Sequence, residues 1–365
     1  LVEINNVAGP AGTYRVELDT GNGLSTDAAE TSVELAAGAR TALDLGLVAT
    51  AIGDQNLRLL VTRPDGTSLV KELTLGIRAA SAPMTTSSLI PLEPGASATL
   101  DAGHFASMVP HTGSLTLALG PIARLDVPEL LLALDRYPYG CAEQVSSRVL
   151  PLLYLNEVAQ TIGLGDDAAL QQRIREAIAN LLAKQNSSGG FGLWGPFSTS
   201  DLWLDSYVTE FLLRARAEGF EVPEQAMTRA LDNLSNQVSY AADFSSGGED
   251  IAYALYDLAR AGRAAIGDLR YYLEARLDAF GSPLAKAQLG AALALYGDRT
   301  RATTAFEAAI AGLAAPEDRR RYRNDYGSRL RDTAGVLALA AEFEPAGIDF
   351  MALAGDLADQ RDRAK

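Results

Sequence analysis

A change in residue periodicity near residue 122 most limits the folds open to this chain. Before it, polar and apolar residues alternate in short runs, as in residues 12–18 and 31–35. From Leu125 onward, apolar residues recur every three or four positions along much longer segments. Alternation is typical of strands, and the longer period is typical of helices. A β part is therefore expected to precede an all-helical part, and 365 residues suffice for two or three domains.

The strongest local signal in the β part is a hairpin. The alternating segments Asn56–Thr62 and Ser68–Leu75 flank Arg63-Pro64-Asp65-Gly66, where Pro and Gly favour reversal of the chain. Short strands at this spacing predict a β-sandwich over residues 1–78.

The segment that joins the β part to the helices is less regular. Residues 79–83, with the sequence Ala-Ala-Ser-Ala-Pro, are interpreted as a linker. A few more strands, such as Ser114–Leu119, are expected within residues 84–121. They are too few for a complete sheet of their own.

Caps and breakers divide the helical part into segments. Asp126-Val127-Pro128-Glu129 is a helix start, and Ser282-Pro283 opens a helix that Gly297 ends. One apolar stripe at helical spacing comprises Leu170, Ile174, Ile178 and Leu181. About eleven helices with short connections predict stacked helical hairpins. An open solenoid and a closed α/α toroid both fit, and the lack of a clean repeat consensus weakens the solenoid.

The only cysteine of the chain lies in Tyr137-Pro138-Tyr139-Gly140-Cys141-Ala142-Glu143-Gln144. Residues three apart on a helical turn point the same way, with Cβ atoms about 5–6 Å apart, so a Cys and a longer Gln can meet. Gly140 allows a tight turn, and the positive end of a helix that starts here favours a thiolate. Taken alone, the pattern also fits a buried, inert cysteine.

This segment resembles the thioester site of the alpha-2-macroglobulin and complement thioester family, especially its bacterial members. The resemblance implies that the sulfur of Cys141 attacks the side-chain carbonyl of Gln144, that ammonia leaves, and that an internal thioester remains. It also implies that Tyr137 shields the thioester from water, with Tyr139 as a second aromatic cover. The alternative for both tyrosines is ordinary packing with bonded hydroxyls.

The same resemblance implies a multidomain α+β fold. A macroglobulin-like β-sandwich would occupy residues 1–78, and the first half of a CUB-like β domain residues 79–122. An all-helical α/α toroid, the thioester domain, would occupy residues 123–365. The second CUB half is expected outside this chain, which is therefore interpreted as a fragment of a longer polypeptide.

A second segment adds to the resemblance. Gly189–Gly195 is followed by Asp201–Val208, and family members carry a similar Gly-rich loop and helix. Trp203, Tyr207 and Phe211, at steps of four, are most simply helix core. The glycines do not form a phosphate-binding loop, because G-K-[ST] is absent.

The chain has two histidines, His104 and His111, and both precede the helical part. In the family that this chain resembles, some complement members use a histidine of the toroid to promote transfer to hydroxyl groups. Residues 123–365 of this chain contain no histidine. Direct attack by amines, chiefly lysine side chains, is therefore expected. Two histidines without a supporting cysteine make a weak metal site, and no cofactor is expected.

These implications predict a single-use endopeptidase inhibitor and not an enzyme. A protease would cut a bait segment elsewhere in the full protein, and a lysine of that protease would attack the Gln144 carbonyl while Cys141 leaves. The expected partners are captured proteases and the other domains of the full-length chain. The expected location is the bacterial periplasm or cell surface, with a role in defence and with any membrane anchor outside this chain.

Charge and composition exclude several other classes. A net charge of −15 argues against nucleic acid and against anionic membrane surfaces. No apolar run reaches the roughly 18 residues of a membrane span. No signal peptide is visible, and the chain starts at Leu1. One cysteine leaves no intrachain disulfide and no cysteine-based zinc site.

Two other classes of function remain open from the residues. Polysaccharide lyases and glycosidases also use α/α toroids beside β-sandwiches, and they need paired acids or a Tyr or His base. Asp201 with Asp205, and Glu249 with Asp250, are the candidate pairs, although a solvated acidic face explains them equally well. The third class is an interaction module whose cysteine is buried and inert.

Overall fold

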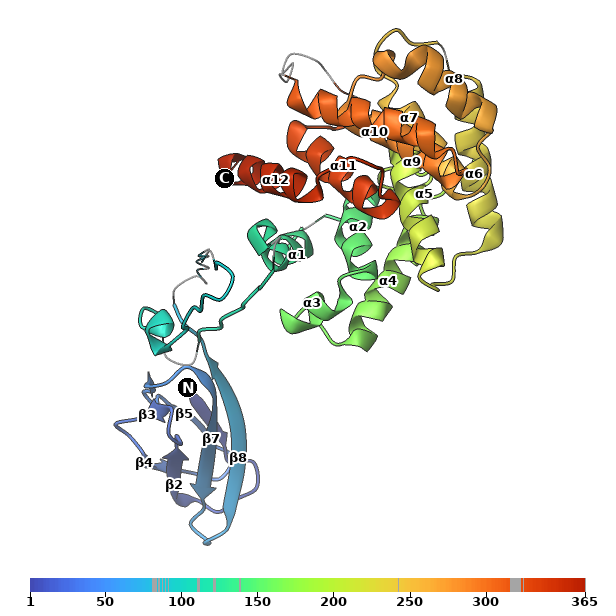
Figure 1. The fold of residues 1–365 in the computed structure, drawn as a ribbon. Helices are drawn as coiled ribbons and strands as arrows, with labels where there is room; N and C mark the ends of the chain where they lie inside the picture. The colour runs from blue at the N-terminus through green and yellow to red at the C-terminus, as the bar shows by residue number, and fades with distance from the viewer. Residues whose placement is uncertain are drawn as a thin grey trace. The chain divides into compact units, whose positions relative to one another are not determined.

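The computed structural model describes residues 1–80, 84, 86, 88, 90, 92–109, 112–120, 123–137, 139–241, 243–315, 323 and 325–364. It separates into two compact units, Leu1–Leu115 and Thr116–Lys365. The named strands belong to the first unit and the named α-helices to the second (Figure 1). The change of periodicity therefore corresponds to a change of secondary structure. The three-part division at residues 78 and 122 stays a prediction.

The first unit is antiparallel. Its strands are β1 (Val2–Asn5), β2 (Gly12–Asp19), β3 (Leu24–Ser25), β4 (Glu30–Leu35), β5 (Arg40–Leu43), β6 (Val48–Ala49), β7 (Gly53–Thr62) and β8 (Ser68–Ile77). A four-stranded sheet has the order β4-β2-β7-β8, while β1 pairs with β5 and β3 with β6. The alternating segments at residues 12–18, 31–35, 56–62 and 68–75 lie in strands, as predicted.

The predicted hairpin is confirmed as β7 and β8. Thr62 pairs with Ser68 at its closed end, and the ladder continues to Gly53 opposite Ile77. The side chain of Asp65 accepts hydrogen bonds from the backbone N–H and the hydroxyl of Thr67, at 2.9 and 2.6 Å. This local bonding is what makes Asp effective in a tight turn.

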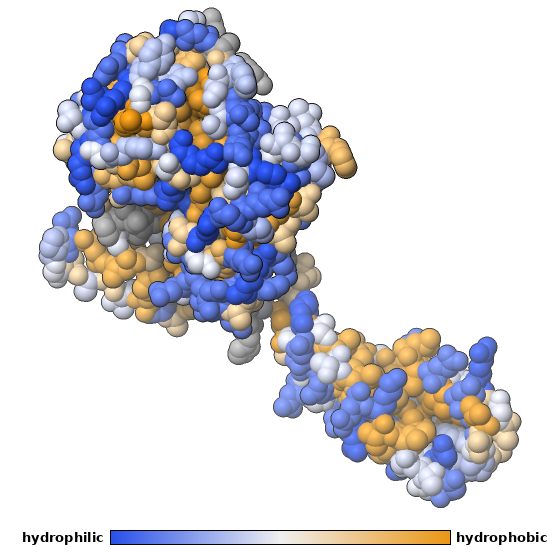
Figure 2. Space-filling model, turned by 90° about the vertical axis from the view of Figure 1, so that its right-hand side faces the viewer, coloured by the Kyte–Doolittle hydropathy of each residue, from blue (hydrophilic) through white to orange (hydrophobic). Residues whose placement is uncertain are grey.

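One face of the four-stranded sheet forms the core of the first unit. Its buried residues are Tyr14, Val16, Leu35, Leu59 and Val61. Residues of β1 and β5 pack against them. The outer strand β8 is exposed along almost its whole length. Figure 2 shows hydrophobic residues at the surface of this unit.

The strands predicted within residues 84–121 are wrong for the described residues. The described part of this segment holds a short 3-10 helix, Ala102–Phe105, and no strand. Ser114–Leu119 is irregular, and the side chain of Leu119 is 82% exposed. Alternation alone does not make a strand, because the backbone N–H and C=O groups also need a neighbouring strand to bond.

The second unit contains twelve α-helices within the described residues. They are α1 (Val127–Asp135), α2 (Ala142–Val149), α3 (Asn156–Thr161), α4 (Asp167–Leu182), α5 (Leu202–Ala217), α6 (Glu224–Ser239), α7 (Glu249–Arg260), α8 (Ile266–Arg276), α9 (Pro283–Leu295), α10 (Arg299–Ala314), α11 (Arg329–Phe343) and α12 (Phe350–Ala364). Short 3-10 helices lie at Ala123–Leu125, Leu150–Leu153 and Leu277–Ala279. Helix α9 packs against α7, α10 and α11 (Figure 1).

Local signals in the sequence determine where these helices begin and end and which side is buried. The side chains of Asp126 and Ser282 accept hydrogen bonds from the backbone of the first turn of α1 and α9. Gly297 follows α9 with φ of 76°, the left-handed conformation that favours glycine. The predicted stripe of Leu170, Ile174, Ile178 and Leu181 is buried on one side of α4. Among the described residues, no helix is long and apolar enough to span a membrane.

Candidate functional site

Cys141 is the N-cap residue of α2. Its backbone is extended, with φ of −68° and ψ of 160°, and its carbonyl accepts the N–H of Val145 at 2.9 Å. Gln144 is then the third residue of the helix. In a capping box the side chains at these two positions bond one another's backbone N–H groups, so both residues belong to the same helix start, although the Cys141 side chain makes no such cap bond here. The two predicted site residues therefore lie at the N-cap and third positions of one helix, and a bond between them stays a prediction.

Cys141 is buried, and Gln144 is partly buried with its side-chain carbonyl oxygen withdrawn from solvent. Cys141 carries a free thiol and is 5% exposed. The Oε1 atom of Gln144 is buried and has no hydrogen-bond partner among the described residues. A buried carbonyl oxygen without a donor is uncommon in folded proteins. The carbonyl group of Gln144 is therefore held beside the helix start without a structural hydrogen bond of its own.

The Gly-rich loop fixes the beginning of α2. The N–H of Ala142 donates to the carbonyl of Leu193 at 2.8 Å, and the N–H of Gly192 donates to the carbonyl of Lys184 at 3.1 Å. A Cβ atom on Gly192 would lie 2.0 Å from the carbonyl oxygen of Gly195. Glycine is needed here because the backbone folds closely upon itself. The sequence indicated the loop, but not its contact with the residue after Cys141.

Asp205 holds the same loop from the side of α5. It is buried, and it accepts hydrogen bonds from the N–H of Phe191 at 2.6 Å and from the side chains of Asn233 and Gln237, each at 2.8 Å. Burial raises the pKa of Asp205 above its ordinary value, and these hydrogen bonds act in the opposite direction. The carboxyl group is therefore a structural acceptor.

The proposed acidic pairs of a lyase or glycosidase do not form a reactive pair here. Asp201 caps α5 by accepting the N–H of Leu204, while Asp205 binds the loop. Glu249 and Asp250 lie in the first turn of α7, where acidic residues suit the helix dipole. These positions explain the four acids without a catalytic role.

The aromatic residues of α5 belong to the hydrophobic core, as the sequence predicted. Tyr207 also contacts a residue of α2. Trp203 and Phe211 are buried, and the Trp203 ring stacks on Tyr207 with centroids 5.1 Å apart. The Tyr207 hydroxyl lies 2.8 Å from the hydroxyl of Ser147, which donates to Glu143 at 2.7 Å. Burial raises the pKa of Tyr207 to about 12. Helix α5 thus contacts α2 beside Gln144.

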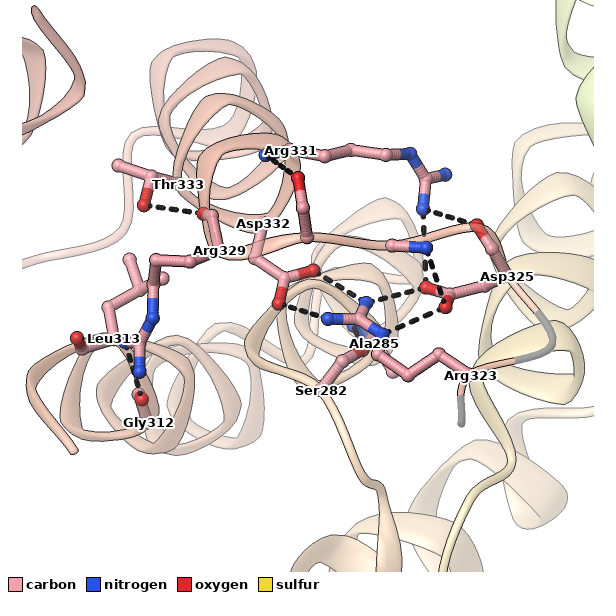
Figure 3. A network of polar contacts seen from close by, with 12 residues as sticks. Ser282, Ala285, Gly312, Leu313, Arg323, Asp325, Arg329, Arg331, Asp332 and Thr333 are labelled. Carbon is pink, nitrogen blue, oxygen red and sulfur yellow. Dashed lines mark hydrogen bonds and ion pairs between the residues drawn. The ribbon is translucent and has the colours of Figure 1, made fainter. Parts of the chain in front are cut away.

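A buried ion-pair cluster continues from Trp203 to α11. Arg323 lies between Asp325 and Asp332, with nitrogen–oxygen distances of 2.6 Å to each (Figure 3). Arg331 bonds Asp325 at 3.2 Å, and its guanidinium lies 5.3 Å from the centre of the Trp203 ring. The cluster could not be predicted from the sequence, because its members form no motif and meet only in the folded chain.

The predicted shielding tyrosines are largely exposed in this chain. Tyr137 is 44% exposed and Tyr139 is 61% exposed, while Pro138 between them lies outside the described residues. Trp194, in the Gly-rich loop, is also exposed. Whether either tyrosine shields a thioester stays a prediction.

The structure describes one of the two histidines, and it lies in the first unit. His104 lies in the 3-10 helix Ala102–Phe105 of the first unit, next to its capping residue Asp101. His111 lies outside the described residues. Over the described part of the chain, no cluster of His, Cys, Asp and Glu is suited to hold a metal ion.

Comparison with known proteins gives one consistent family. Residues 114–256 match the family model described as the A-macroglobulin TED domain. The alpha-2-macroglobulin of Escherichia coli is 33% identical over 331 residues, which are 85% of this chain and 20% of the relative. The chain therefore spans about a fifth of the length of that curated relative.

Solved structures agree with the sequence matches. The native E. coli alpha-2-macroglobulin is similar with a TM-score of 0.69 and 30% identity, over 98% of this chain and 24% of that one. The Salmonella alpha-2-macroglobulin reacted with methylamine is similar with a TM-score of 0.66, 30% identity and the same two coverages. Both similarities extend over nearly the whole chain.

Proposed function

The chain belongs to the bacterial alpha-2-macroglobulin family and contains its thioester domain, and we propose that it is the part of a protease-trapping protein that bonds covalently to the captured protease. The observation that carries this proposal is the placement of Cys141 and Gln144 at the N-cap and third position of α2. Both residues lie in one helix start, and no other residue of the chain is a cysteine.

The proposed bond forms between the sulfur of Cys141 and the side-chain carbonyl carbon of Gln144. Sulfur attacks that carbon, the carbon–nitrogen bond breaks, and the amide nitrogen leaves as ammonia. An amine of the target later attacks the same carbon, and the electron pair of the carbon–sulfur bond stays on Cys141 as thiolate. The product is an amide between Gln144 and the target, so each molecule reacts once.

The attacking group is proposed to be an amine, chiefly the side chain of lysine. Residues 123–365 contain no histidine that could activate a hydroxyl group. Amines are nucleophilic without such a base, whereas hydroxyl groups need one. Proteases are the proposed target class, and the similar structures include the E. coli protein activated by trypsin.

The finer architecture is part of the same proposal. Residues 1–78 would be a macroglobulin-like sandwich, residues 79–122 the first half of a CUB-like domain, and residues 123–365 an α/α toroid. A CUB half without its partner strands fits the absence of strands from the described part of residues 79–122. The other domains of a longer protein would cover the site, with Tyr137 and Tyr139 at the cover.

The proposed setting is the bacterial periplasm or cell surface, where the protein would defend the cell against foreign proteases. A single thiol held as a thioester needs protection from water and not from reduction. The setting is tested by fractionating cells that produce the complete protein, and recovery in the cytosol would contradict it.

Methylamine tests the chemistry directly. Treatment of the complete protein is expected to release one thiol per chain, and a thiol reagent measures it. Cys141→Ala removes the thiol and is expected to abolish the signal, while Gln144→Asn shortens the acyl side and is expected to leave Cys141 free before any treatment. Unchanged thiol content in the wild-type protein would contradict the proposal.

A further inference from the structure

Two buried polar atoms of α2 lack hydrogen-bond partners, and they are complementary. The Oε1 atom of Gln144 is an acceptor and the Nε atom of Arg148 is a donor, and neither is bonded in the described part of the chain. Both residues lie within the eight residues of this helix. Buried polar atoms are nearly always paired in folded proteins, so an unpaired acceptor and an unpaired donor on one short helix need an explanation.

Helix geometry places the two side chains on the same side of α2. Gln144 and Arg148 are four positions apart, and such residues face one another with Cβ atoms about 5–6 Å apart. Side chains on a helix also lean toward its N-terminus. Arg148 therefore leans over the turn that carries Gln144, and the unpaired donor and the unpaired acceptor are neighbours.

The guanidinium group of Arg148 is held near the motif without being neutralised. Its Nη1 atom donates to the backbone carbonyl of Tyr137, which precedes Cys141, at 3.5 Å. Over the described residues this is the one hydrogen bond of the side chain, and it makes no ion pair with a carboxylate. Arg214 and Arg323 of the same unit do pair with carboxylates. Because a guanidinium is always charged, Arg148 can stabilise an anion that forms beside it.

Such an anion forms in the proposed reaction. When the attacking amine bonds to the carbonyl carbon of Gln144, an electron pair of the C=O bond moves onto Oε1. We propose that the Nε–H of Arg148 donates a hydrogen bond to this oxyanion. The carbonyl then re-forms, the carbon–sulfur bond breaks, and its electron pair stays on Cys141. The proton lost from the attacking nitrogen passes to water, while Arg148 keeps its own. This inference deepens the proposed function and rests on it.

Closure of the thioester needs the same stabilisation. The sulfur of Cys141 attacks the same carbon of Gln144, so Oε1 carries the same negative charge before ammonia leaves. In the structure the thiol is free, and Oε1 belongs to a neutral amide. Catalytic hydrogen bonds often tighten only as charge develops, which fits a donor and an acceptor that are close but not yet bonded. Arg148 would thus serve both closure and opening.

One rival donor must be distinguished from Arg148. The indole Nε1 of Trp203, on α5, is the other buried side-chain donor without a hydrogen-bond partner in the ranges that the structure describes. It is neutral and belongs to a different helix. Arg148 is a cation one turn from Gln144 on the same helix, and hydrogen bonds from a cation to an anion are the stronger ones. Both donors therefore enter the test.

The first measurement is the rate at which methylamine releases thiol from the complete protein. Arg148→Met keeps the apolar stem, removes the N–H groups and is expected to slow the release about a hundredfold. Arg136→Ala removes an exposed arginine from the segment before the motif and, as the matched control, should leave the rate unchanged. Trp203→Phe should likewise retain most of the rate. Circular dichroism establishes that each variant is folded.

The second measurement separates a donated hydrogen bond from a general effect of charge or packing. Arg148→Ala is incubated with guanidinium chloride before and during methylamine treatment, because closure and opening pass through the same oxyanion. The guanidinium concentration stays far below that which unfolds the protein. Guanidinium supplies charge and N–H donors and is expected to restore part of the rate, whereas tetramethylammonium, which has no N–H, is not. Arg148→Lys keeps the charge without the Nε–H. It should also react slowly, and it replaces a neutral variant that fails to fold.

Several results would overturn the inference. They are a wild-type rate in folded Arg148→Met, a loss confined to Trp203→Phe, no recovery of Arg148→Ala in guanidinium, and equal recovery in tetramethylammonium. Failure of the proposed function is recognised separately. It would appear as no released thiol in the wild-type protein, and it would remove this inference as well, whereas the four results above leave the wild-type reaction intact.

Discussion

The backbone N–H of Ala142 donates to the carbonyl oxygen of Leu193 at 2.8 Å. This hydrogen bond joins the start of α2, one residue after Cys141, to a Gly-rich loop about fifty positions later in the chain. The loop is held in turn by the buried carboxyl group of Asp205 through the N–H of Phe191. The position of Cys141 and Gln144 therefore depends on packing within the helical unit, and not only on the motif.

The first prediction concerns the tightest point of this loop. Gly192→Ala places a Cβ 2.0 Å from the carbonyl oxygen of Gly195, so the loop must move. We expect a loss of about 1–3 kcal/mol in the free energy of unfolding, together with less methylamine-released thiol. Chemical denaturation and thiol titration measure the two effects.

Gly195→Ala is the matched control for that substitution. A Cβ at Gly195 has no atom within 4 Å, so stability and thiol release should stay close to wild type. Equal losses in the two variants would show that the close approach at Gly192 does not matter.

The second prediction concerns the buried carboxyl group of Asp257 in α7. Neither of its oxygens has a hydrogen-bond partner in the described part of the chain. Burial and the nearby Glu210 raise its pKa well above the ordinary value. The native state therefore favours the protonated acid. The stabilisation that this gives the folded protein is complete below the pKa of the unfolded state, about 4, and is lost as the pH rises through the pKa of the folded state.

Asp257→Asn removes this titration while keeping the shape of the side chain. Relative to wild type, the variant should gain stability as the pH rises from about 4 to 8. Denaturant unfolding at several pH values measures the difference, with the exposed Asp278→Asn as control. A difference that does not vary with pH would contradict the assignment.

The third prediction concerns the ion-pair cluster at the start of α11. Arg323→Met leaves the buried carboxyl groups of Asp325 and Asp332 without their main partner. Breaking a buried pair on one side costs about 3–5 kcal/mol, whereas exposed pairs contribute about 0–1 kcal/mol. Arg263→Met, which breaks the more exposed pair with Asp232, is the comparison. Similar losses in both variants, measured by denaturation, would refute the structural role of the cluster.

The fourth prediction concerns shielding in the complete protein. Tyr137→Gly removes the proposed aromatic cover and should speed the spontaneous loss of the thioester, because water then reaches the Gln144 carbonyl. The appearance of free thiol over time measures this loss. Tyr240→Gly changes an exposed tyrosine at the end of α6, outside the motif, and should leave the rate unchanged. A decay rate unaffected by Tyr137→Gly would show that this residue does not guard the bond.

Local signals in the sequence were sufficient for much of the fold. The turn at Pro64-Asp65-Gly66 and the caps at Asp126 and Ser282 act through neighbouring backbone groups, so they can be predicted from short segments. The stripe from Leu170 to Leu181 similarly requires only helical periodicity.

Contacts between distant residues could not be predicted in the same way. The bond from Ala142 to Leu193 and the burial of Lys184 beside the loop depend on how α2, α4 and α5 pack. The error at Ser114–Leu119 has a related cause, because a strand needs a partner that the alternating pattern does not supply. The motif indicated Cys141 and Gln144 as the residues to examine. The fold showed that the Gly-rich loop holds the start of the helix on which they lie.

The most direct test is peptide mapping of the complete protein after treatment with methylamine. The proposed chemistry predicts a methylamide at Gln144 and, in equal amount, a free thiol at Cys141. It also predicts that Cys141→Ala abolishes the methylamide, since an ordinary glutamine amide does not react with amines under these conditions. An unmodified Gln144 in the wild-type protein, or a methylamide that persists in Cys141→Ala, would contradict the central claim that these two residues form a thioester.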